Sequence, residues 1–194
     1  MRDMKSKDIS AKAEKKSFLG ELLDWAKELC VAVVLVILIT AFVARPVRVE
    51  GHSMEPTLSE RDFLILRLLG YIPAQGDIVA VNCDGLEKVI IKRIIAIGGQ
   101  EIYIDFDAGK VYIDGEIFEI DGIENITTER ESNLTYPIKV PDGKYFVMGD
   151  NRQHSTDSRS SSVGLVDRDD ILGKAVCRFY PFNRIGTLYT KGKD

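Results

Sequence analysis

The feature that most constrains this chain is an apolar stretch without a single charge, residues 29–44. Built as an α-helix, these sixteen residues would extend about 24 Å, which approaches the roughly 30 Å hydrocarbon core of a bilayer. Trp25, Lys27 and Arg45 flank the stretch, and an indole ring and long cationic side chains are favoured in the headgroup layer. The sequence therefore predicts a single transmembrane anchor over 29–44.

Two other interpretations of this stretch are a buried core helix and a removable signal peptide. A helix that packs on the core of a small globular domain keeps a polar face toward solvent, and this stretch has none. Signal-peptide cleavage needs small residues at positions −1 and −3. Ala44 at −1 would place Phe42 at −3, and Ala41 at −1 would place Ile39 there. A retained anchor is the better interpretation.

The distribution of charge predicts an orientation and excludes one class of partner. Residues 1–27 contain seven Lys and Arg, so the positive-inside tendency places the segment 1–28 in the cytoplasm and residues 45–194 outside the plasma membrane. The chain has 26 Lys and Arg against 30 Asp and Glu, and residues 45–194 alone carry a formal charge of −5. Nucleic-acid-binding proteins usually carry a basic excess, so no nucleic acid is expected as a partner.

Residues 45–194 have the pattern of an antiparallel β domain, so the fold class is mainly β. Short β-rich runs alternate with glycine-containing turn signals, and Asp114-Gly115 predicts a tight hairpin. This spacing favours a sandwich or coiled-sheet architecture, in which the polar segment 105–142 forms a small β insertion. The expected strands are 47–49, 63–66, 77–81, 89–97, 101–104, 110–113, 145–148 and 171–180. The apolar run 63–69 is either a core strand or a surface that rests on lipid.

Cysteine and histidine are too few for a disulfide framework or a zinc cluster. The chain has three cysteines, an odd number. Cys83 and Cys177 lie in expected strands and are interpreted as small apolar residues, with a bridge between them as the alternative. No cluster has zinc-ligand spacing, and no glutamate closes an EF-hand loop. We therefore expect neither a metal nor another cofactor.

Ser53 is a candidate nucleophile. It follows an expected strand and precedes a proline turn in the run Gly51-His52-Ser53-Met54-Glu55-Pro56. A serine in such a place is usually an ordinary turn residue, and a nucleophilic serine needs a base. His52 is its direct neighbour and would point to the opposite face of an extended chain. His154 lies in a polar loop near acidic residues, so a Ser-His-Asp triad stays open.

Lys92 is the other candidate base. Alternation along the expected strand 89–97 places Ile90, Lys92, Ile94 and Ala96 on one face, so the lysine points where its apolar neighbours point. Desolvation can lower a lysine pKa from about 10.4 by roughly 3–5 units. A neutral amine could accept the proton of a serine hydroxyl. The alternative is a lysine that extends into solvent at a sheet edge.

A third polar segment, residues 149–159, could form an Asx turn, an anion-binding nest or part of a catalytic site. Taken together and in chain order, the segments resemble the bacterial type I signal peptidases, membrane-anchored Ser/Lys proteases, and most of all their compact Gram-positive form. Each segment alone is weak evidence for this family, but all of them in this order behind one anchor are a specific match. The segments are Ser53-Met54-Glu55-Pro56-Thr57-Leu58, Gly76-Asp77-Ile78-Val79, Lys92-Arg93 and Gly149-Asp150-Asn151 with Ser155 and Asp157-Ser158-Arg159.

The resemblance implies a role for several residues. Ser53 would be the nucleophile and Lys92 the general base, and the backbone N–H of Ser53 would donate to the oxyanion. The supporting residues would be Ser155, bonded to Lys92, and the pairs Asp150–Arg93 and Asp157–Arg159. Shallow pockets for the small P1 and P3 side chains of Ala-x-Ala sites would be lined by Val49, Met54, Leu58, Ile90 and Ile91.

The chain departs from the family pattern at two places. Gly51 stands where some members place a second oxyanion-donating hydroxyl. After the base, Ala96-Ile97-Gly98-Gly99-Gln100 replaces the usual Gly-Leu-Pro-Gly-Asp. The second departure leaves the catalytic pair untouched but changes the local turn.

The expected function is that of a membrane-bound serine endopeptidase, signal peptidase I, which removes signal peptides from exported preproteins after Ala-x-Ala sites. Its partners would be secreted preproteins and the lipid bilayer. One alternative is a catalytically silent, membrane-tethered β-domain that binds exported peptides. Another is a self-cleaving repressor-type peptidase, which the anchor and the absence of a DNA-binding half argue against.

Overall fold

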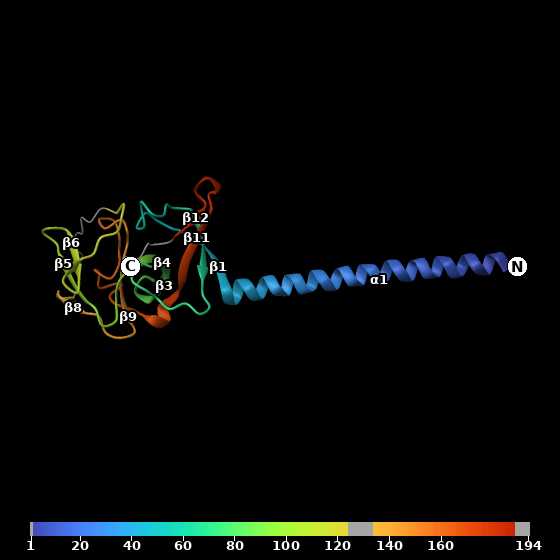
Figure 1. Cartoon of the computed structure of the whole chain (residues 1–194), viewed down its shortest axis with the longest axis horizontal. Helices are drawn as coiled ribbons and strands as arrows, with labels where there is room; N and C mark the ends of the chain where they lie inside the picture. The colour runs from blue at the N-terminus through green and yellow to red at the C-terminus, as the bar shows by residue number, and fades with distance from the viewer. Residues whose placement is uncertain (1, 124–133, 189–194) are drawn as a thin grey trace. The chain divides into compact units, whose positions relative to one another are not determined.

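The computed structural model describes residues 2–123 and 134–188 (Figure 1). The chain divides into two compact units, Met1–Phe42 and Val43–Asp194, and each is described by itself. The first unit consists of α1 (Arg2–Leu38), which is followed by a π-helical turn (Ile39–Val43).

Contrary to the prediction, the apolar stretch 29–44 does not form one continuous α-helix. It is divided between α1, the π-helical turn and the first residue of β1 (Ala44–Arg48). Thr40 Oγ1 donates to the carbonyl oxygens of Val36 at 2.9 Å and Ile37 at 3.2 Å, and such bonds from a side chain compete with the regular helical ladder. Within the described part of the chain, no helix is both long and apolar enough to span a membrane.

The second unit contains two antiparallel sheets, which confirms the mainly β prediction (Figure 1). The larger sheet has eight strands in the order β1-β2-β11-β3-β4-β9-β10, with β12 paired to β11, and the smaller has the order β7-β6-β5-β8. The remaining strands are β2 (Phe63–Arg67), β3 (Ile78–Cys83), β4 (Lys88–Ile97), β5 (Glu101–Asp105), β6 (Lys110–Ile113), β7 (Glu116–Ile117), β8 (Ile138–Lys139), β9 (Lys144–Met148), β10 (Val166–Asp167), β11 (Ile171–Tyr180) and β12 (Gly186–Thr187).

The predicted hairpin at Asp114-Gly115 is present between β6 and β7. Asp114 has φ 52° and Gly115 has φ 84°, and positive φ at both central residues is the requirement of a type I′ turn. The strands predicted from alternation are all present. The two-residue strands β8, β10 and β12 were not predicted, because two residues carry no periodic pattern.

Core residues cover both faces of the larger sheet. In β3, Ile78 and Ala80 belong to one buried cluster, while Val79 and Val81 belong to another. A third cluster contains the apolar residues of β5 and β6 together with residues of β4 and β9. Along the apolar run 63–69 the outcome is mixed, because Leu64 and Leu66 are fully buried whereas Leu69 is 64% exposed.

A bulge in β4 corrects one part of the predicted strand face. The register with β9 shifts between Ile94 and Ala96, and an extra residue in a bulge breaks the two-residue alternation. Ile90 and Ile94 share a cluster as predicted, but Ala96 joins Ile95 in the cluster of the smaller sheet. The prediction that all four residues share one face is therefore wrong at Ala96.

The unusual turn after β4 connects the two sheets. The Gln100 side chain accepts a hydrogen bond from the Ile97 N–H at 3.0 Å, and Gly99 N–H donates to the Val140 carbonyl at 2.9 Å. Gly99 has φ 89°, a conformation that favours glycine. Gln100 thus closes the turn through its side chain. Cys83 and Cys177 are both free, as interpreted from the sequence.

Candidate active site

Ser53 lies in a turn that two buried side chains fix to the core. Met54 and Leu58 are almost fully buried, and Leu58 N–H donates to the Met54 carbonyl at 2.8 Å. Gly51 begins the turn with φ 78°, which a residue with a Cβ adopts only with strain. These two apolar anchors, which both follow Ser53 in the chain, hold the half-buried serine at the surface of a cleft.

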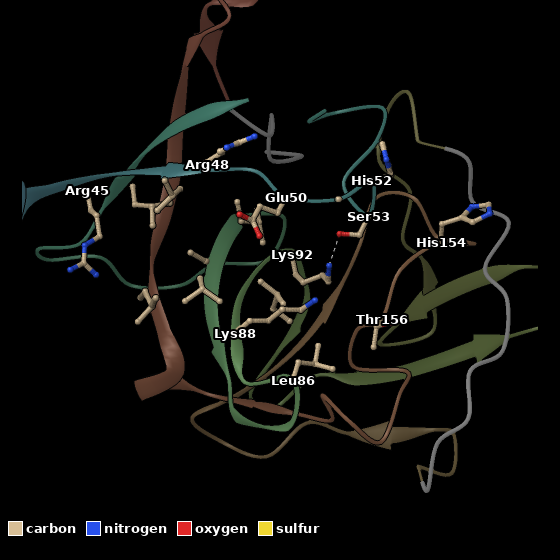
Figure 2. Close-up of a pocket in the computed structure, with 18 residues that line it drawn as sticks. Arg45, Arg48, Glu50, His52, Ser53, Leu86, Lys88, Lys92, His154 and Thr156 are labelled. Atoms are coloured by element: carbon tan, nitrogen blue, oxygen red, sulfur yellow. Dashed lines mark hydrogen bonds between the residues drawn. The ribbon is translucent and has the colours of Figure 1, made fainter. Parts of the chain in front are cut away.

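Lys92 points from the middle of β4 directly at this serine. Its amine Nζ donates a hydrogen bond to Ser53 Oγ at 2.6 Å (Figure 2), and the residue is only 4% exposed. Burial lowers the pKa of Lys92 to about 8. The carboxylates of Asp157 and Asp150 oppose this shift, whereas the charges of Lys88 and Arg159 add to it. Burial in apolar surroundings therefore prevails over the nearby carboxylates.

Two buried, bidentate ion pairs lie next to the serine–lysine pair, in the pairing expected from the resemblance. Arg93 donates through Nε to Asp150 Oδ1 at 2.8 Å and through Nη2 to Oδ2 at 2.6 Å. Arg159 makes the same two bonds to Asp157, both at 2.8 Å. Burial alone would raise the pKa of Asp157, but the hydrogen bonds and charge of Arg159 hold it below its ordinary value. Arg93 directly follows Lys92 in β4, and Asp157 lies two residues after Ser155 in the loop 149–159. The two ion pairs therefore fix the strand and the loop that carry these predicted site residues.

The loop 149–159 packs tightly against the Ser53 turn. Asn151 N–H donates to the Ser53 carbonyl at 3.0 Å, and Gly149 N–H donates to Asp157 Oδ2 at 2.9 Å. A Cβ on Gly149 would collide with the Ser53 carbonyl oxygen and with Ser155 Oγ. Only glycine therefore permits this approach. Ser155 is 3% exposed and hydrogen-bonds Asp157, while its predicted bond to Lys92 stays a prediction.

Neither histidine is bonded to Ser53. His52 Nδ1 lies 2.9 Å from Glu55 Oε1, and this hydrogen bond raises the pKa of His52. His154 Nδ1 lies 3.2 Å from Asn151 Oδ1. Because the Ser53 hydroxyl is bonded to Lys92 instead, the geometry favours the lysine over the Ser-His-Asp triad.

A cleft of about 600 Å³ opens beside the serine and the lysine (Figure 2). Of the predicted substrate-binding residues, Ile90 and Ile91 line it. Val49, Met54 and Leu58 are not among the lining residues and lie in a buried core cluster. The cleft is lined by Arg45, Val47, Arg48, Glu50, Gly51, His52, Ser53, Leu66, Ala80, Leu86, Lys88, Val89, Ile90, Ile91, Lys92, His154, Thr156 and Leu172.

Sequence reasoning missed several charged residues of this region. Arg45, Arg48 and Lys88 line the cleft, and Arg152 is buried in the loop beside it, where burial lowers its pKa. Alternation could have identified Lys88, which is four residues before Lys92 and thus on the same face of the strand. Among the described residues, no group of three or more His, Cys, Asp or Glu side chains is placed to hold a metal ion.

A serine hydroxyl bonded to a desolvated lysine in an antiparallel β unit defines a candidate serine hydrolase with a lysine base. The family model of the signal peptidases, peptidase S26, matches residues 22–180. The chain is 39% identical over 175 residues to a signal peptidase I of Bacillus licheniformis, covering 86% of this chain and 92% of that relative. It is 38% identical over 197 residues to signal peptidase I S of Bacillus subtilis (strain 168), covering 94% and 98%.

A crystal structure of a signal peptidase I from Enterococcus faecalis V583 is 28% identical to this chain. The match covers 55% of this chain and 98% of the chain in that crystal structure, with a TM-score of 0.44. On the family model and the sequence relatives, the chain belongs to the signal peptidase family and is a peptidase.

Proposed function

We propose that this protein removes signal peptides from exported preproteins, with Ser53 as the nucleophile and Lys92 as the general base. The observation that carries the proposal is the 2.6 Å contact between the buried Lys92 Nζ and Ser53 Oγ. A nucleophile needs its base within hydrogen-bond reach, and a lysine base needs a lowered pKa. Both conditions are met at this one contact.

The pKa determines how much of the base is available. With a pKa near 8, about one Lys92 side chain in ten is neutral at pH 7, against about one in three thousand for a lysine at 10.5. Neutral Lys92 would take the Ser53 proton as Oγ attacks the scissile carbonyl, then give it to the leaving amine. The acyl-enzyme would be hydrolysed by a water that the same amine deprotonates.

The backbone N–H of Ser53 is the proposed donor to the oxyanion. No acceptor among the described residues bonds this N–H, so it is available to a substrate, whereas the Ser53 carbonyl is held by Asn151. Because Gly51 offers no hydroxyl, the hole would depend on backbone donors. In this proposal Ser155 and the pairs Arg93–Asp150 and Arg159–Asp157 position the catalytic groups.

The proposal includes attachment to the plasma membrane through residues 29–44, with residues 1–28 in the cytoplasm and 45–194 outside. The uncharged stretch and the seven basic residues before it support this arrangement. Ser53 follows Ala44 by nine residues, a distance of roughly 30 Å at most in extended chain. The nucleophile would thus stay near the membrane face where a signal peptide ends. Ile90 and Ile91 would favour small side chains next to the scissile bond.

The test is cleavage of a preprotein with an Ala-x-Ala site by the full chain in detergent. We expect Ser53→Ala and Lys92→Ala each to lower kcat/KM by about a thousandfold or more, while Lys110→Ala, an exposed lysine of β6, leaves it unchanged. Activity should rise with pH with a midpoint near 8. Activity that survives Lys92→Ala and is lost in His154→Ala would assign the base to His154. No cleavage of several preproteins by the folded parent would favour the peptide-binding domain.

A further inference from the structure

A second lysine, Lys88, lies on the same face of β4 as Lys92. Both belong to the part of the strand that pairs with β3 in one uninterrupted register, and the bulge of β4 comes only after Ile94. Alternation therefore places both side chains on one face. Both lysines line the cleft, and Figure 2 shows the two amines next to each other. A second cation thus faces the amine that is bonded to Ser53.

The strand between the two lysines brings their charges into reach of each other. Four residues at about 3.3 Å each separate the two Cα atoms by about 13 Å, and long side chains that lean along a strand can close most of this gap. The side chain between them on this face is Ile90, which is 7% exposed and belongs to an apolar cluster. Apolar groups between two charges exclude water, so the charges are screened less than in solvent.

Several other charged groups face Lys92 or share its cleft. After burial, the charges with the largest influence on the pKa of Lys92 are those of Asp157, Lys88, Asp150 and Arg159. Figure 2 shows Arg45 and Arg48 apart from the two amines, and His52 and His154 on the far side of Ser53. The remaining charged groups are Glu50 in the cleft, Arg93 next to Lys92 in β4, and Arg152 in the loop 149–159.

Lys88 differs from the charges of the loop because it has no carboxylate partner of its own. Asp150 and Asp157 each form a bidentate pair with an arginine, and the two charges of such a pair largely cancel at a distance. The ion pairs of the described residues do not include Lys88. Its charge therefore acts on Lys92 without compensation, and a nearby like charge disfavours the protonated amine.

We propose that Lys88 is a positioning residue of the site, which acts through Lys92 by favouring the neutral form of its amine. The proposal rests on the peptidase function proposed above and adds to it a residue that touches neither the substrate nor the reacting atoms. Because Lys88 is exposed, solvent screens part of the interaction, and the expected effect is moderate.

The test is the pH profile of kcat/KM for a preprotein with an Ala-x-Ala site, measured with the full chain in a nonionic detergent at low salt. We expect Lys88→Gln to raise the midpoint of the profile by about 0.5 pH unit. Its kcat/KM would then be about threefold below that of the parent at pH 7. At pH 10 it would equal that of the parent, because Lys92 would be neutral in both proteins.

Three further variants and a salt series show whether charge is responsible. Lys88→Glu should raise the midpoint by about 1 pH unit, since it replaces a repelling charge with an attracting one. Lys88→Arg keeps the charge and should restore the midpoint of the parent to within about 0.2 unit. Lys110→Gln, the same change at the exposed lysine of β6, should leave the midpoint unchanged. In about 1 M NaCl the difference between Lys88→Gln and the parent should fall below about 0.2 unit.

A direct titration of Lys92 separates this proposal from the peptidase function. The carbon NMR resonances of lysine Cε report the protonation of each amine in the labelled full chain, and the Lys92 resonance is the one lost in Lys92→Met. We expect Lys88→Gln to raise this titration by the same 0.5 unit. A raised titration in a protein that cleaves no preprotein would sustain the role of Lys88 and reject the peptidase function.

Three outcomes would overturn the role of Lys88. One is a midpoint and a Lys92 titration that stay unchanged in Lys88→Gln while the parent cleaves its substrate. Another is a loss of kcat/KM that is equal at pH 7 and pH 10, which would place Lys88 in substrate binding. The third is a Lys88→Arg variant with the same raised midpoint as Lys88→Gln, which would show that the charge is not what matters.

Discussion

The two sheets of the β unit bury different kinds of side chain. The strands of the smaller sheet bury only apolar residues, among those the structure describes, including Ile102, Ile104, Val111 and Ile113. The larger sheet and its loops contain all of the described buried charged and polar side chains, which are Asp62, Asp77, Lys92, Arg93, Asp150, Arg152, Ser155, Asp157, Ser158 and Arg159. Burial of an apolar side chain stabilises a fold directly, whereas a buried charge does so only when it is paired. The difference indicates that the larger sheet holds the candidate site and the smaller one contributes mainly to stability.

The largest effect on stability is expected where a buried charge loses its partner. In Arg159→Met, the fully buried Asp157 keeps its charge without the guanidinium, and we expect the free energy of unfolding to fall by about 3–5 kcal/mol. Urea denaturation of the full chain in detergent, followed by circular dichroism, measures the change. The double variant Asp157→Leu/Arg159→Met should recover part of the loss, because it buries no unpaired charge. A loss below about 1 kcal/mol would mean that the buried pair behaves like a surface pair.

A cavity in the smaller sheet should affect stability without affecting chemistry. Ile104 is 3% exposed in β5, and Ile104→Ala should lower the free energy of unfolding by about 3 kcal/mol. At a temperature where the variant stays folded, kcat/KM should stay within about twofold of the parent, since Ile104 is not among the residues that line the cleft. A large loss of activity in the folded variant would contradict the division of roles between the sheets.

Removal of the buried charge of Lys92 should stabilise the fold. The pKa of Lys92 is about 8 in the folded chain and 10.5 when unperturbed, so the unfolded state binds more protons between these values and stability rises with pH there. At pH 7 we expect Lys92→Met to gain about 2 kcal/mol, after loss of the Ser53 hydrogen bond. The gain should shrink as the pH rises from 8 to 10.5. Lys110→Met is the control, and its effect should not depend on pH. A Lys92→Met variant that is less stable than the parent at pH 7 would show that the amine is well solvated.

The smallest effect is expected at an exposed ion pair of the larger sheet. Lys144 Nζ lies 2.7 Å from Asp167 Oδ1, with side chains 36% and 57% exposed. Lys144→Ala should change the free energy of unfolding by less than about 1 kcal/mol, and the change should decrease in high salt. A larger change in the same urea experiment would contradict this prediction. It would show that the exposure of an ion pair does not by itself determine how much the pair contributes to the free energy of unfolding.

Local patterns in the sequence predicted most of the strands and the orientation of Lys92. Alternation along β4 is a property of neighbouring residues, so it could be recognised without the fold. The contact between Asn151 and Ser53 joins segments about a hundred residues apart, and no local pattern indicates it. The same is true of the cleft, since Arg45 and Lys88 both line it although β2, β11 and β3 separate their strands in the sheet. The bulge at Ile95 also depends on pairing with β9.

The place of β11 in the larger sheet has a consequence for how the protein matures. This C-terminal strand lies between β2 and β3 and pairs with both, so it connects the strand that follows the Ser53 turn to the pair of strands that carries Lys92. A chain synthesised from its N-terminus holds these two parts long before the strand that joins them exists. Ser53 and Lys92 are therefore held in one sheet only after β11 has been synthesised. The order of strands in the sheet makes the contact between these two residues depend on a segment that lies far beyond both of them in the sequence.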